Sequence, residues 1–584
     1  MKNICKKWFA LALAVCMGLS ASACGKKDTS SSGSDEVLGY DVVESGKSAS
    51  VPDNADMDTD KNLGLLIDKS SKGAKVVNNC YETGYPIAKD KVKFKIMLVD
   101  HVNGADLSKR AFTKYISQKF NIDLEYELVS SAQVSEKVTL AFASGNLPDM
   151  FWGMALYGDV SKLNSYVKDN ALYSFDDYKA YAPNIYKMLD KYKDARYLCT
   201  SDDGKMYTIP LVREDQETLY RDKFYINKTW LKKLGLSMPK TLNDLTAVLR
   251  AFKNNDPNGN GKKDEIPMMF VNEIPTSWYG IFGVSTYNYF TRTADNQILN
   301  VNLMNEYKTA LKTLSDYYSE GLLYNYEIRN INSTKAMSML NASVKTVGIV
   351  NANNYSSVMS AETFLNDYTM MPLIDGTGNG TNVASYMDVE QMWSLFCMIP
   401  KKCKYPEIAV RMIDYFYTTE GGVTAQYGPP SKSLYWYYND AGKPVLTNNG
   451  VNYSALVPGH TVPRYMSNEV LNFFTNEVKY KTKEEAQAVA VEKELFKNYY
   501  GSLKPRMTYN APLTAEERAR ENKEVSSSLT QKAFEWRYQF VYNVKNIDSD
   551  WSAYVNDITR LGAKTVEEDK QAADTRMQNW LKTH

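Results

Sequence analysis

Residues 225–267 read YINKTWLKKLGLSMPKTLNDLTAVLRAFKNNDPNGNGKKDEIP and divide into a helical segment and an oxygen-rich loop. Within the first part, PKTLNDLTAVLRAF places leucines and a phenylalanine at the spacing of an amphipathic helix. Thr241 is a favourable N-cap, because its hydroxyl can accept a hydrogen bond from a backbone N–H of the first turn. The pair Asn254-Asn255 marks the expected end of this helix. The sequence therefore predicts a helix that follows Thr241 and buries one apolar face.

The second part, DPNGNGKKDE, concentrates oxygen atoms in one loop. Ca²⁺ prefers six to eight oxygen ligands, and an EF-hand-type loop supplies them at alternating positions with a glycine at position 6. Counting from the first aspartate places Gly261 there. The predicted calcium ligands are the side chains of Asp256, Asn258, Asn260, Asp264 and Glu265 and the backbone carbonyl of Lys262.

The loop departs from an EF-hand in one respect, because Pro267 stands where the closing glutamate is expected. Glu265 is the candidate replacement. No open coordination position or nucleophile is implied, so the predicted role of calcium is structural, with an affinity suited to extracellular calcium. A solvated Asn-Asp-Gly turn is the alternative interpretation.

The N-terminus is typical of a secretory leader. Three lysines precede an apolar run that starts at Trp8 and is too short to span a membrane. The sequence ASACG, residues 21–25, resembles a bacterial lipobox in which Cys24 is lipidated, although Ala21 stands where leucine is usual. Ordinary secretion with cleavage near Ala23 is the alternative. Residues 24–75 are rich in Ser, Asp and Gly, which indicates a flexible tether.

Composition excludes several classes of function. The 69 Lys and Arg nearly balance the 68 Asp and Glu, so nothing favours binding to nucleic acid. With 584 residues, two or more domains are expected. The three histidines suggest no metal pair. Four cysteines lie in the body of the chain, and their spacing matches no zinc site and fixes no disulfide pairing: Cys80, Cys199, Cys397 and Cys403.

The body alternates strands and helices. Residues 92–98, 122–128 and 149–152 have strand patterns, and the segments between them have helical spacing, with Gly145 as a C-cap. This order predicts βαβ units and a parallel sheet. Further predicted elements are strands at 218–227 and 393–400, a helix within 405–422 with Pro406 in its first turn and Gly421 past its end, and a mostly helical region from 511 to 584.

Four stretches match a known pattern: KVTLAFASGNLPDMFW (137–152), DGKMYTIP (203–210), the opening segment (225–267) and KYPEIAVRMIDYFYTTEG (404–421). The chain resembles the family 1 extracellular solute-binding proteins of sugar ABC transporters, in the long lipoprotein form of Gram-positive bacteria. After Gly428 it has PPSKSLYWYY where that family often has an EG-x-x-Y run.

The resemblance implies an α/β fold of the two-lobed, periplasmic-binding-protein-like type II, with a hinge, a ligand cleft between the lobes and a helical C-terminal region. The implied segments are 1–23 (lipoprotein signal peptide), 24–75 (tether), 76–205 and 389–420 (lobe 1), 206–388 (lobe 2) and 421–584 (a C-terminal region packing on both lobes).

The resemblance also implies a function that is not enzymatic. The protein would capture an oligosaccharide or related solute and deliver it to the permease subunits of an ABC transporter. It would be a monomer, anchored to the lipid bilayer through acylated Cys24 on the outer face of a Gram-positive cell. The chain has no GxxxxGK[ST] loop, so transport needs a separate ATPase.

Sugar ligands have apolar ring faces on which aromatic side chains stack, and hydroxyl edges that polar side chains bind. Trp152 is expected at a strand end, where ligands of open α/β sheets bind. The alternative for each aromatic residue is packing in the core. The predicted ligand contacts are Asp149, Trp152, Trp278, Tyr279, Trp436 and Tyr437.

Two other functions stay open. A secreted glycosidase needs two carboxylates about 5–9.5 Å apart at a sugar site, and no motif indicates such a pair. A receptor for peptides or cell-wall fragments would use a similar cleft, because a fold does not determine its ligand.

Overall fold

The structure is a computed structural model. It describes residues 70–100, 107–130, 132–153, 160–214, 222–284, 290–293, 295–324, 331–378, 392–430, 435–439, 441–446, 462–474, 482–500, 511–524 and 528–584. The predicted signal peptide, Cys24 and the predicted tether up to residue 69 lie outside these ranges. Within them, no helix is both long and apolar enough to cross a membrane.

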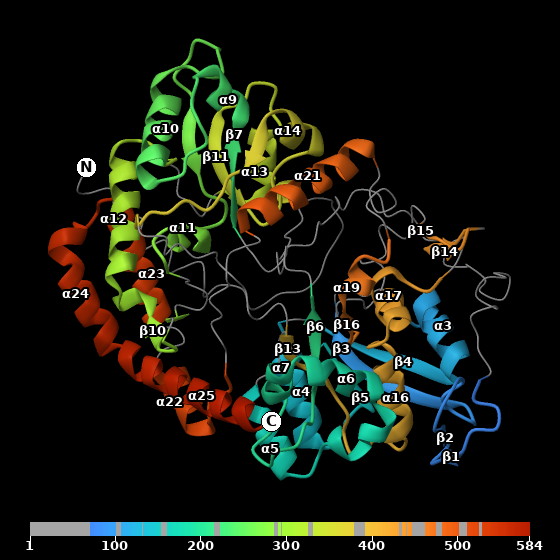
Figure 1. The fold of residues 1–584 in the computed structure, drawn as a ribbon. Coiled ribbons are helices and arrows are strands. Elements are labelled where there is room, and N and C mark those ends of the chain that lie inside the picture. The colour runs from blue at the N-terminus through green and yellow to red at the C-terminus, as the bar shows by residue number, and fades with distance from the viewer. Residues whose placement is uncertain are drawn as a thin grey trace, which may run out of the picture. The chain divides into compact units, whose positions relative to one another are not determined.

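A six-stranded sheet is formed in the described part of the chain, in the order β16-β6-β13-β5-β3-β4 (Figure 1). The prediction of parallel strands is confirmed, since β3 is parallel to both β4 and β5. In contrast, β13 runs antiparallel to β5 and β6. The bounds are β3 Val92–Val99, β4 Ile122–Val129, β5 Met150–Trp152, β6 Ile209–Arg213, β13 Met392–Met398 and β16 Tyr465–Met466.

The two faces of β3 explain its alternating sequence. Phe94, Ile96 and Leu98 are buried in the core. Lys93 and Lys95 in the strand, and Lys91 just before it, pair with acids of β4, as opposite charges on neighbouring strands favour. The ion pairs are Lys91–Asp123 at 2.9 Å, Lys93–Glu125 at 2.5 Å and Lys95–Glu127 at 2.7 Å.

Helices from early and late parts of the chain accompany the six strands. They are α3 Ala111–Phe120, α4 Val134–Ser144, α5 Val160–Lys168, α6 Pro183–Lys191, α7 Lys193–Leu198, α16 Pro406–Tyr415, α17 Thr419–Tyr427 and α19 Asn468–Leu471. The predicted cap is confirmed at Gly145, which ends α4 with φ 70°. Two short hairpins are β1 Val76–Val77 with β2 Cys80–Tyr81 and β14 Trp436–Tyr438 with β15 Pro444–Leu446.

The prediction of a single helix within 405–422 is wrong at its end. Helix α16 ends at Tyr415, and a second helix, α17, starts with Thr418 as its N-cap. Gly421 therefore lies inside α17 rather than past a helix end. A Cβ at this position would collide with the carbonyl of Tyr415 and lie 2.7 Å from the Cα of Phe416. The glycine is needed for close packing between the helices, which a helix-ending signal in the sequence does not distinguish.

A four-stranded sheet forms the second core, in the order β12-β7-β11-β8. Its strands are β7 Lys223–Asn227, β8 Ile266–Met269, β11 Val347–Ala352 and β12 Tyr368–Met370. β11 is parallel to β8 and antiparallel to β7. The accompanying helices are α9 Lys228–Lys233, α10 Leu242–Asn254, α11 Thr276–Gly280, α12 Asn305–Ser319, α13 Ser333–Leu340, α14 Ala361–Asn366 and α21 Lys483–Tyr500.

Helix α10 confirms the prediction made for residues 241–254. The hydroxyl of Thr241 accepts from the backbone N–H of Asp244 at 3.1 Å, and the Asp244 carboxylate accepts from the N–H of Thr241 at 3.0 Å. This reciprocal capping box satisfies two otherwise free donors of the first turn. Leu245, Leu249 and Phe252 are buried, and α10 packs against β8 through this apolar face.

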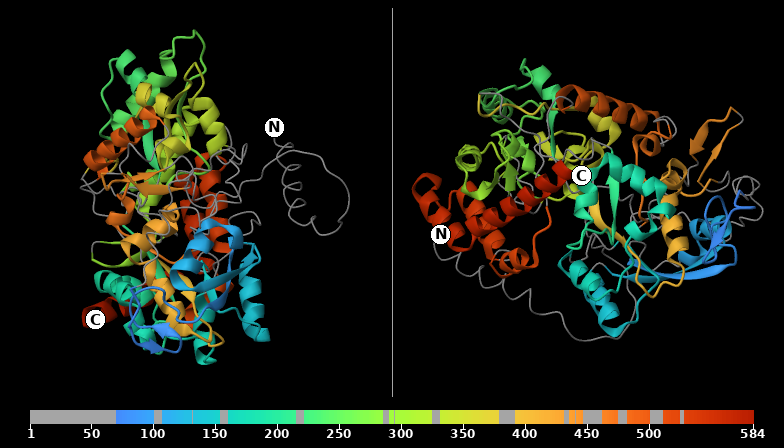
Figure 2. Two further views of the ribbon diagram at one scale, coloured as in Figure 1. Left: turned by 90° about the vertical axis from the view of Figure 1, so that its right-hand side faces the viewer. Right: turned by 60° about the horizontal axis from the view of Figure 1, so that its bottom comes forward.

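Helices form the end of the chain, and most of them add to the second core. They are α22 Ala515–Glu524, α23 Ser528–Val541, α24 Ile547–Arg560 and α25 Ala563–Thr583, and α24 packs against both α23 and α25 (Figure 2, red). Helix α25 covers the edge of β10 (Ile298–Asn300), which pairs with β9 (Phe290–Arg292). The side chains of Gln571 and Glu567 accept from the backbone N–H groups of Ile298 and Asn300 at 2.8 and 2.6 Å. A helix therefore satisfies the edge that a further strand would otherwise pair.

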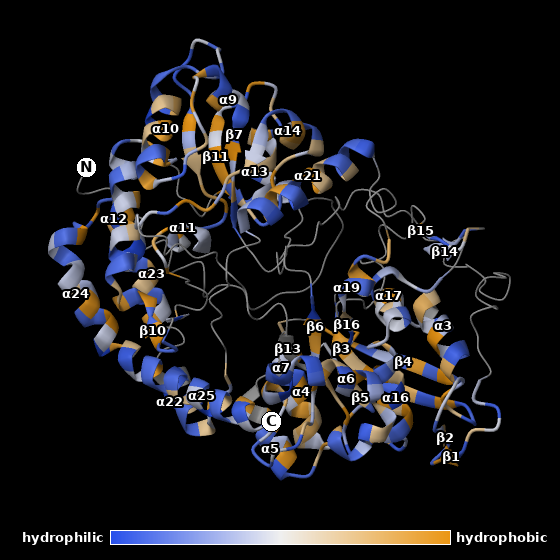
Figure 3. Ribbon diagram, in the orientation of Figure 1, coloured by the Kyte–Doolittle hydropathy of each residue, from blue (hydrophilic) through white to orange (hydrophobic). Residues whose placement is uncertain are grey.

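The two sheets have separate apolar cores, visible as hydrophobic strands between more hydrophilic helix surfaces in Figure 3. Residues 421–584 contribute to both, through α17 in the first core and α21, α23 and α24 in the second. The boundaries drawn from the sequence stay predictions. The four cysteines of the body are buried thiols.

Candidate functional site

The oxygen-rich loop after α10 is organised by its first aspartate. Oδ1 of Asp256 accepts from the backbone N–H of Gly259 at 2.8 Å and of Asn260 at 3.1 Å, and Oδ2 accepts from Gly261 at 2.9 Å. Gly259 and Gly261 have φ of 76° and 72°, a region that glycine adopts without strain. The loop can fold around this carboxylate because both positions that need a positive φ are glycines, which have no Cβ.

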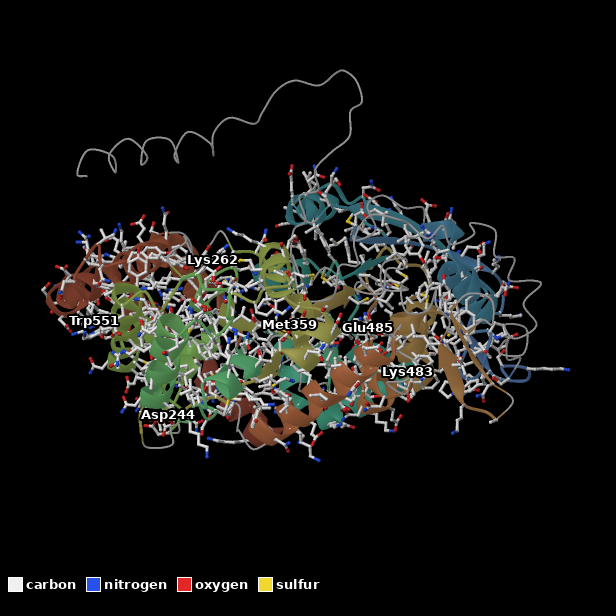
Figure 4. The ribbon with its side chains drawn as sticks, turned by 90° about the horizontal axis from the view of Figure 1, so that it is seen from above. Asp244, Lys262, Met359, Lys483, Glu485 and Trp551 are labelled. Atoms are coloured by element: carbon white, nitrogen blue, oxygen red, sulfur yellow. The ribbon has the colours of Figure 1, made fainter. Side chains whose placement is uncertain are left out.

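The two asparagines connect the beginning of the loop to its end. Their Oδ1 atoms accept backbone N–H groups: Asn258 from Asn260 at 2.9 Å, and Asn260 from Lys262 at 2.8 Å. Their Nδ2 groups both donate to the carboxylate of Asp264. These amide hydrogen bonds, and the charge of Lys262 (labelled in Figure 4), hold the pKa of Asp264 below its usual value.

Glu265 differs from the other acids of the loop. Its Oε1 is buried and has no hydrogen-bond partner within the described residues. Burial raises the pKa of Glu265, and the negative charges of Asp264 and Asp256 raise it further. A buried carboxylate oxygen without a donor is costly, and a cation would remove that cost.

The chemistry of the predicted ligand set fits calcium. All six groups offer oxygen, the donor that Ca²⁺ prefers, and they lie within one ten-residue loop. Among the described residues, no group of three or more His, Cys, Asp or Glu could hold a metal by itself. A calcium site here therefore depends on the asparagine and backbone oxygens as well as the acids.

A lysine outside the loop also belongs to this site. Nζ of Lys233, the last residue of α9, donates to the carbonyl of Pro257 at 2.8 Å and lies 3.5 Å from that of Asp256. Sequence reasoning did not identify it, because the residue precedes the loop by a whole helix and no spacing rule connects the two.

A polar network joins three strand ends at one edge of the four-stranded sheet. Asp222, just before β7, has φ 58°, and its Oδ2 accepts from the N–H and hydroxyl of Thr276 at 3.2 and 3.0 Å. Oδ1 of Asn351, in β11, accepts from the N–H of Val271, which follows β8, at 2.8 Å. Parallel strands β8 and β11 both end here, at the kind of edge where open α/β sheets bind ligands.

Trp278 and Tyr279 lie in α11 beside this edge but are buried. Trp278 is 0% exposed, and its Nε1 donates to the carbonyl of Ala310 at 3.1 Å. The ring of Tyr279 stacks on that of Tyr307 at 5.1 Å between centroids. The sequence signalled a loop with aromatic residues but could not signal that they turn inward.

Asp149 directly precedes β5, and Trp152 is the last residue of the strand. Oδ2 of Asp149 accepts from the backbone N–H of Lys95 at 2.7 Å, and burial raises the pKa of this carboxyl. Trp152 is at the carboxyl end, as expected, but is 0% exposed and contacts Phe416 edge-on. The structure does not bring these two residues together as one ligand contact.

The β14–β15 hairpin separates its aromatic residues by burial. Trp436 is 2% exposed and donates from Nε1 to the carbonyl of Gly428 at 2.8 Å. Tyr437 is half-buried. Tyr438, the next residue, is 48% exposed. The burial of Trp152, Trp278, Tyr279 and Trp436 favours core packing, and ligand contact by any of the six residues stays a prediction.

Comparison with known proteins identifies the family. Residues 105–423, more than half of the chain, match the family described as bacterial extracellular solute-binding protein. The chain belongs to this family. Its fold is that of the type II periplasmic-binding-protein-like members, as solved structures show. A human-milk-oligosaccharide (HMO) binding, ABC-transporter-associated solute-binding protein from Bifidobacterium longum infantis aligns with TM-score 0.67 and 17% identity, over 83% of this chain and 98% of that one.

Relatives of this solute-binding protein include fructooligosaccharide ABC transporter substrate-binding protein FusA of Streptococcus pneumoniae. It is 30% identical over 250 residues, covering 41% of this chain and 46% of FusA. The polygalacturonan/rhamnogalacturonan-binding protein YtcQ of Bacillus subtilis is 26% identical over 38% of this chain and 47% of its own length. The chain spans under half the length of these relatives.

A solved structure of FusA, an EF-hand mutant in complex with fructo-nystose, aligns with TM-score 0.65 and 22% identity over 83% of this solute-binding protein and 100% of that chain. At this identity the likeness concerns the fold. The description of that relative names an EF-hand, the type of loop predicted here from residues 256–265.

Proposed function

We propose that this solute-binding protein captures an oligosaccharide outside the cell and delivers it to the permease subunits of an ABC transporter. The observation that carries the proposal is the family match over residues 105–423. FusA, whose name specifies fructooligosaccharides, supports a glycan as the ligand class. The protein acts by binding rather than by catalysis.

The mechanism follows from an equilibrium between open and closed arrangements of two lobes. A ligand that contacts both lobes binds the closed state better and shifts the population toward it. In lobe 2, the polar edge built by Asp222, Thr276 and Asn351 offers hydroxyl, amide and carboxylate groups of the type that bind sugar hydroxyls. Closure then presents a liganded face to the permease.

Calcium is the proposed structural cofactor. Asp256, Asn258, Asn260, Asp264 and Glu265, with the carbonyl of Lys262, would hold it. The ion would supply positive charge to a loop whose Glu265 oxygen is buried without a donor.

The proposed location is the outer face of the cell membrane of a Gram-positive bacterium, with a lipid on Cys24 as anchor. The leader sequence supports this part, since residues 21–25 resemble a lipobox. The receptor would act as a monomer, and a separate ATPase would drive the transport of the captured ligand.

The test is a thermal-shift screen of the chain from residue 25 onward against plant and host glycans. A ligand that binds only the native state raises the melting temperature by mass action. We expect a rise with one class of glycan and no reducing sugar released over hours. Release of sugar would replace the receptor with a glycosidase, and a rise with peptides alone would replace the glycan.

A further inference from the structure

The calcium loop carries positive charge and N–H donors of its own. Lys233 places its ammonium against the carbonyls of Asp256 and Pro257. The contact is close, because a Cβ on Gly259 would lie 2.8 Å from Nζ. The ammonium therefore lies against the backbone of the loop, at the end of an exposed side chain.

The carboxylate of Asp264 is largely occupied by amides. An ionised carboxylate offers about four lone-pair positions. Oδ1 accepts from Nδ2 of Asn258 at 2.9 Å and of Asn260 at 3.1 Å, and Oδ2 accepts from Asn260 at 3.0 Å. The orientation of both amides is fixed, since their Oδ1 atoms accept backbone N–H groups. About three of the four positions are therefore filled without an ion.

The acid at the start of the loop is satisfied in the same way. The two oxygens of Asp256 accept three backbone N–H groups. Of the three acids in the predicted ligand set, Glu265 is the one with a buried oxygen and no partner among the described residues. The loop thus has a nearly complete set of internal hydrogen bonds.

We propose that the amides of Asn258 and Asn260, by donating to Asp264, keep the loop folded without calcium and lower its affinity for the ion, and that the charge of Lys233 beside the loop lowers this affinity further. The inference rests on the proposed calcium role. Calcium must displace amide donors from Asp264 and bind near a lysine charge, so it binds more weakly than the oxygen count alone would give. In return, the fold does not depend on the ion.

The ion-free state is tested by amide hydrogen exchange of the full mature chain in EDTA and in calcium. The backbone N–H groups of Gly259, Asn260, Gly261 and Lys262 all donate to side chains of the loop. We expect them to be protected in EDTA, with little further protection in calcium. Rapid exchange in EDTA followed by protection in calcium would overturn the proposal.

The lysine is tested by calcium titration calorimetry of Lys233→Gln. Removing its charge should tighten calcium binding roughly three-fold at low salt, with a smaller effect at 1 M salt, because salt screens the interaction. Lys232→Gln is the matched control, with the same charge change on an exposed neighbour. Weaker binding in Lys233→Gln, or the same change in both variants, would contradict the role of Lys233.

The amides are tested by the double variant Asn258→Asp with Asn260→Asp. Its carboxylates cannot donate to Asp264 and repel it, so exchange of residues 259–262 in EDTA should become fast, while calcium binding tightens roughly tenfold. Unchanged protection in EDTA would contradict the proposal even if no variant binds calcium. Loss of calcium binding in every protein, with protection kept in the wild type, would refute the calcium site but support the self-satisfied loop.

Discussion

At the scale of single residues, the surroundings of a carboxylate decide its charge and its role. Asp264 accepts amide hydrogen bonds that favour the ionised form. Glu265, next to it, is half-buried, its Oε1 has no donor among the described residues, and burial raises its pKa and so favours the neutral form. The pKa values of these two adjacent acids are thus shifted in opposite directions. A bound cation would stabilise the ionised form of Glu265 more than that of Asp264.

Replacement of Glu265 by glutamine should therefore remove most of the stabilisation by calcium. With 1 mM calcium and an affinity of about 0.1 mM, mass action gives roughly 1.4 kcal/mol. We expect calcium to raise the melting temperature of the wild type by a few degrees over EDTA, and of Glu265→Gln by much less. Glu494→Gln, an equal charge change on an exposed residue of α21, is the control. An undiminished calcium shift in Glu265→Gln would exclude it as a ligand.

Asp414 predicts a pH dependence of stability. Its carboxylate accepts from the N–H groups of Asn184 and Ile185 at 2.9 and 2.8 Å, but burial raises its pKa from 3.8 to about 6. The folded state thus binds the proton more tightly than the unfolded state. The stabilising contribution is complete below about pH 4 and is lost as the pH rises to about 6, by at most about 3 kcal/mol.

Urea unfolding of the wild type and Asp414→Asn between pH 4 and 7 measures this contribution. The amide cannot ionise, and its oxygen can still accept from the two backbone N–H groups. We expect the stability of the wild type to fall relative to the variant over this range. Parallel profiles would show that Asp414 does not titrate between the two states.

At the scale of elements, the sequence predicts what local chemistry controls. The cap at Thr241, the end of α10 before the loop and the alternation of β3 depend on neighbouring residues, and the structure confirms them. The inward turn of Trp278 and the contact of Lys233 with the loop depend on distant partners. Residue type and spacing carry no signal for such contacts.

The tight crossing at Gly421 gives a test of this element scale. Gly421→Ala should destabilise the first core by about 2–3 kcal/mol or more, because backbone atoms rather than a movable side chain oppose the new methyl. Gly145→Ala is the control: its φ is 70° but nothing lies within 4 Å of a Cβ, so strain of about 1–2 kcal/mol is expected. Chemical unfolding that ranks Gly145→Ala as the more damaging change would contradict the packing role of Gly421.

At the scale of the whole molecule, two sheets with separate cores are linked by a chain that returns to the first sheet through β13. This architecture suits a protein whose lobes move as bodies while each core stays intact. The family match supports a receptor, and the proposed ligand class comes from named relatives. The identity of the sugar depends on side chains at the strand ends, which the sequence pattern does not specify.

The most direct measurement is small-angle X-ray scattering of the mature chain with and without a glycan that raises its melting temperature. Closure of two lobes on a bridging ligand predicts a smaller radius of gyration in the bound state, restored when the glycan is removed by dialysis. A glycan that binds tightly and leaves the scattering curve unchanged would contradict capture by lobe closure.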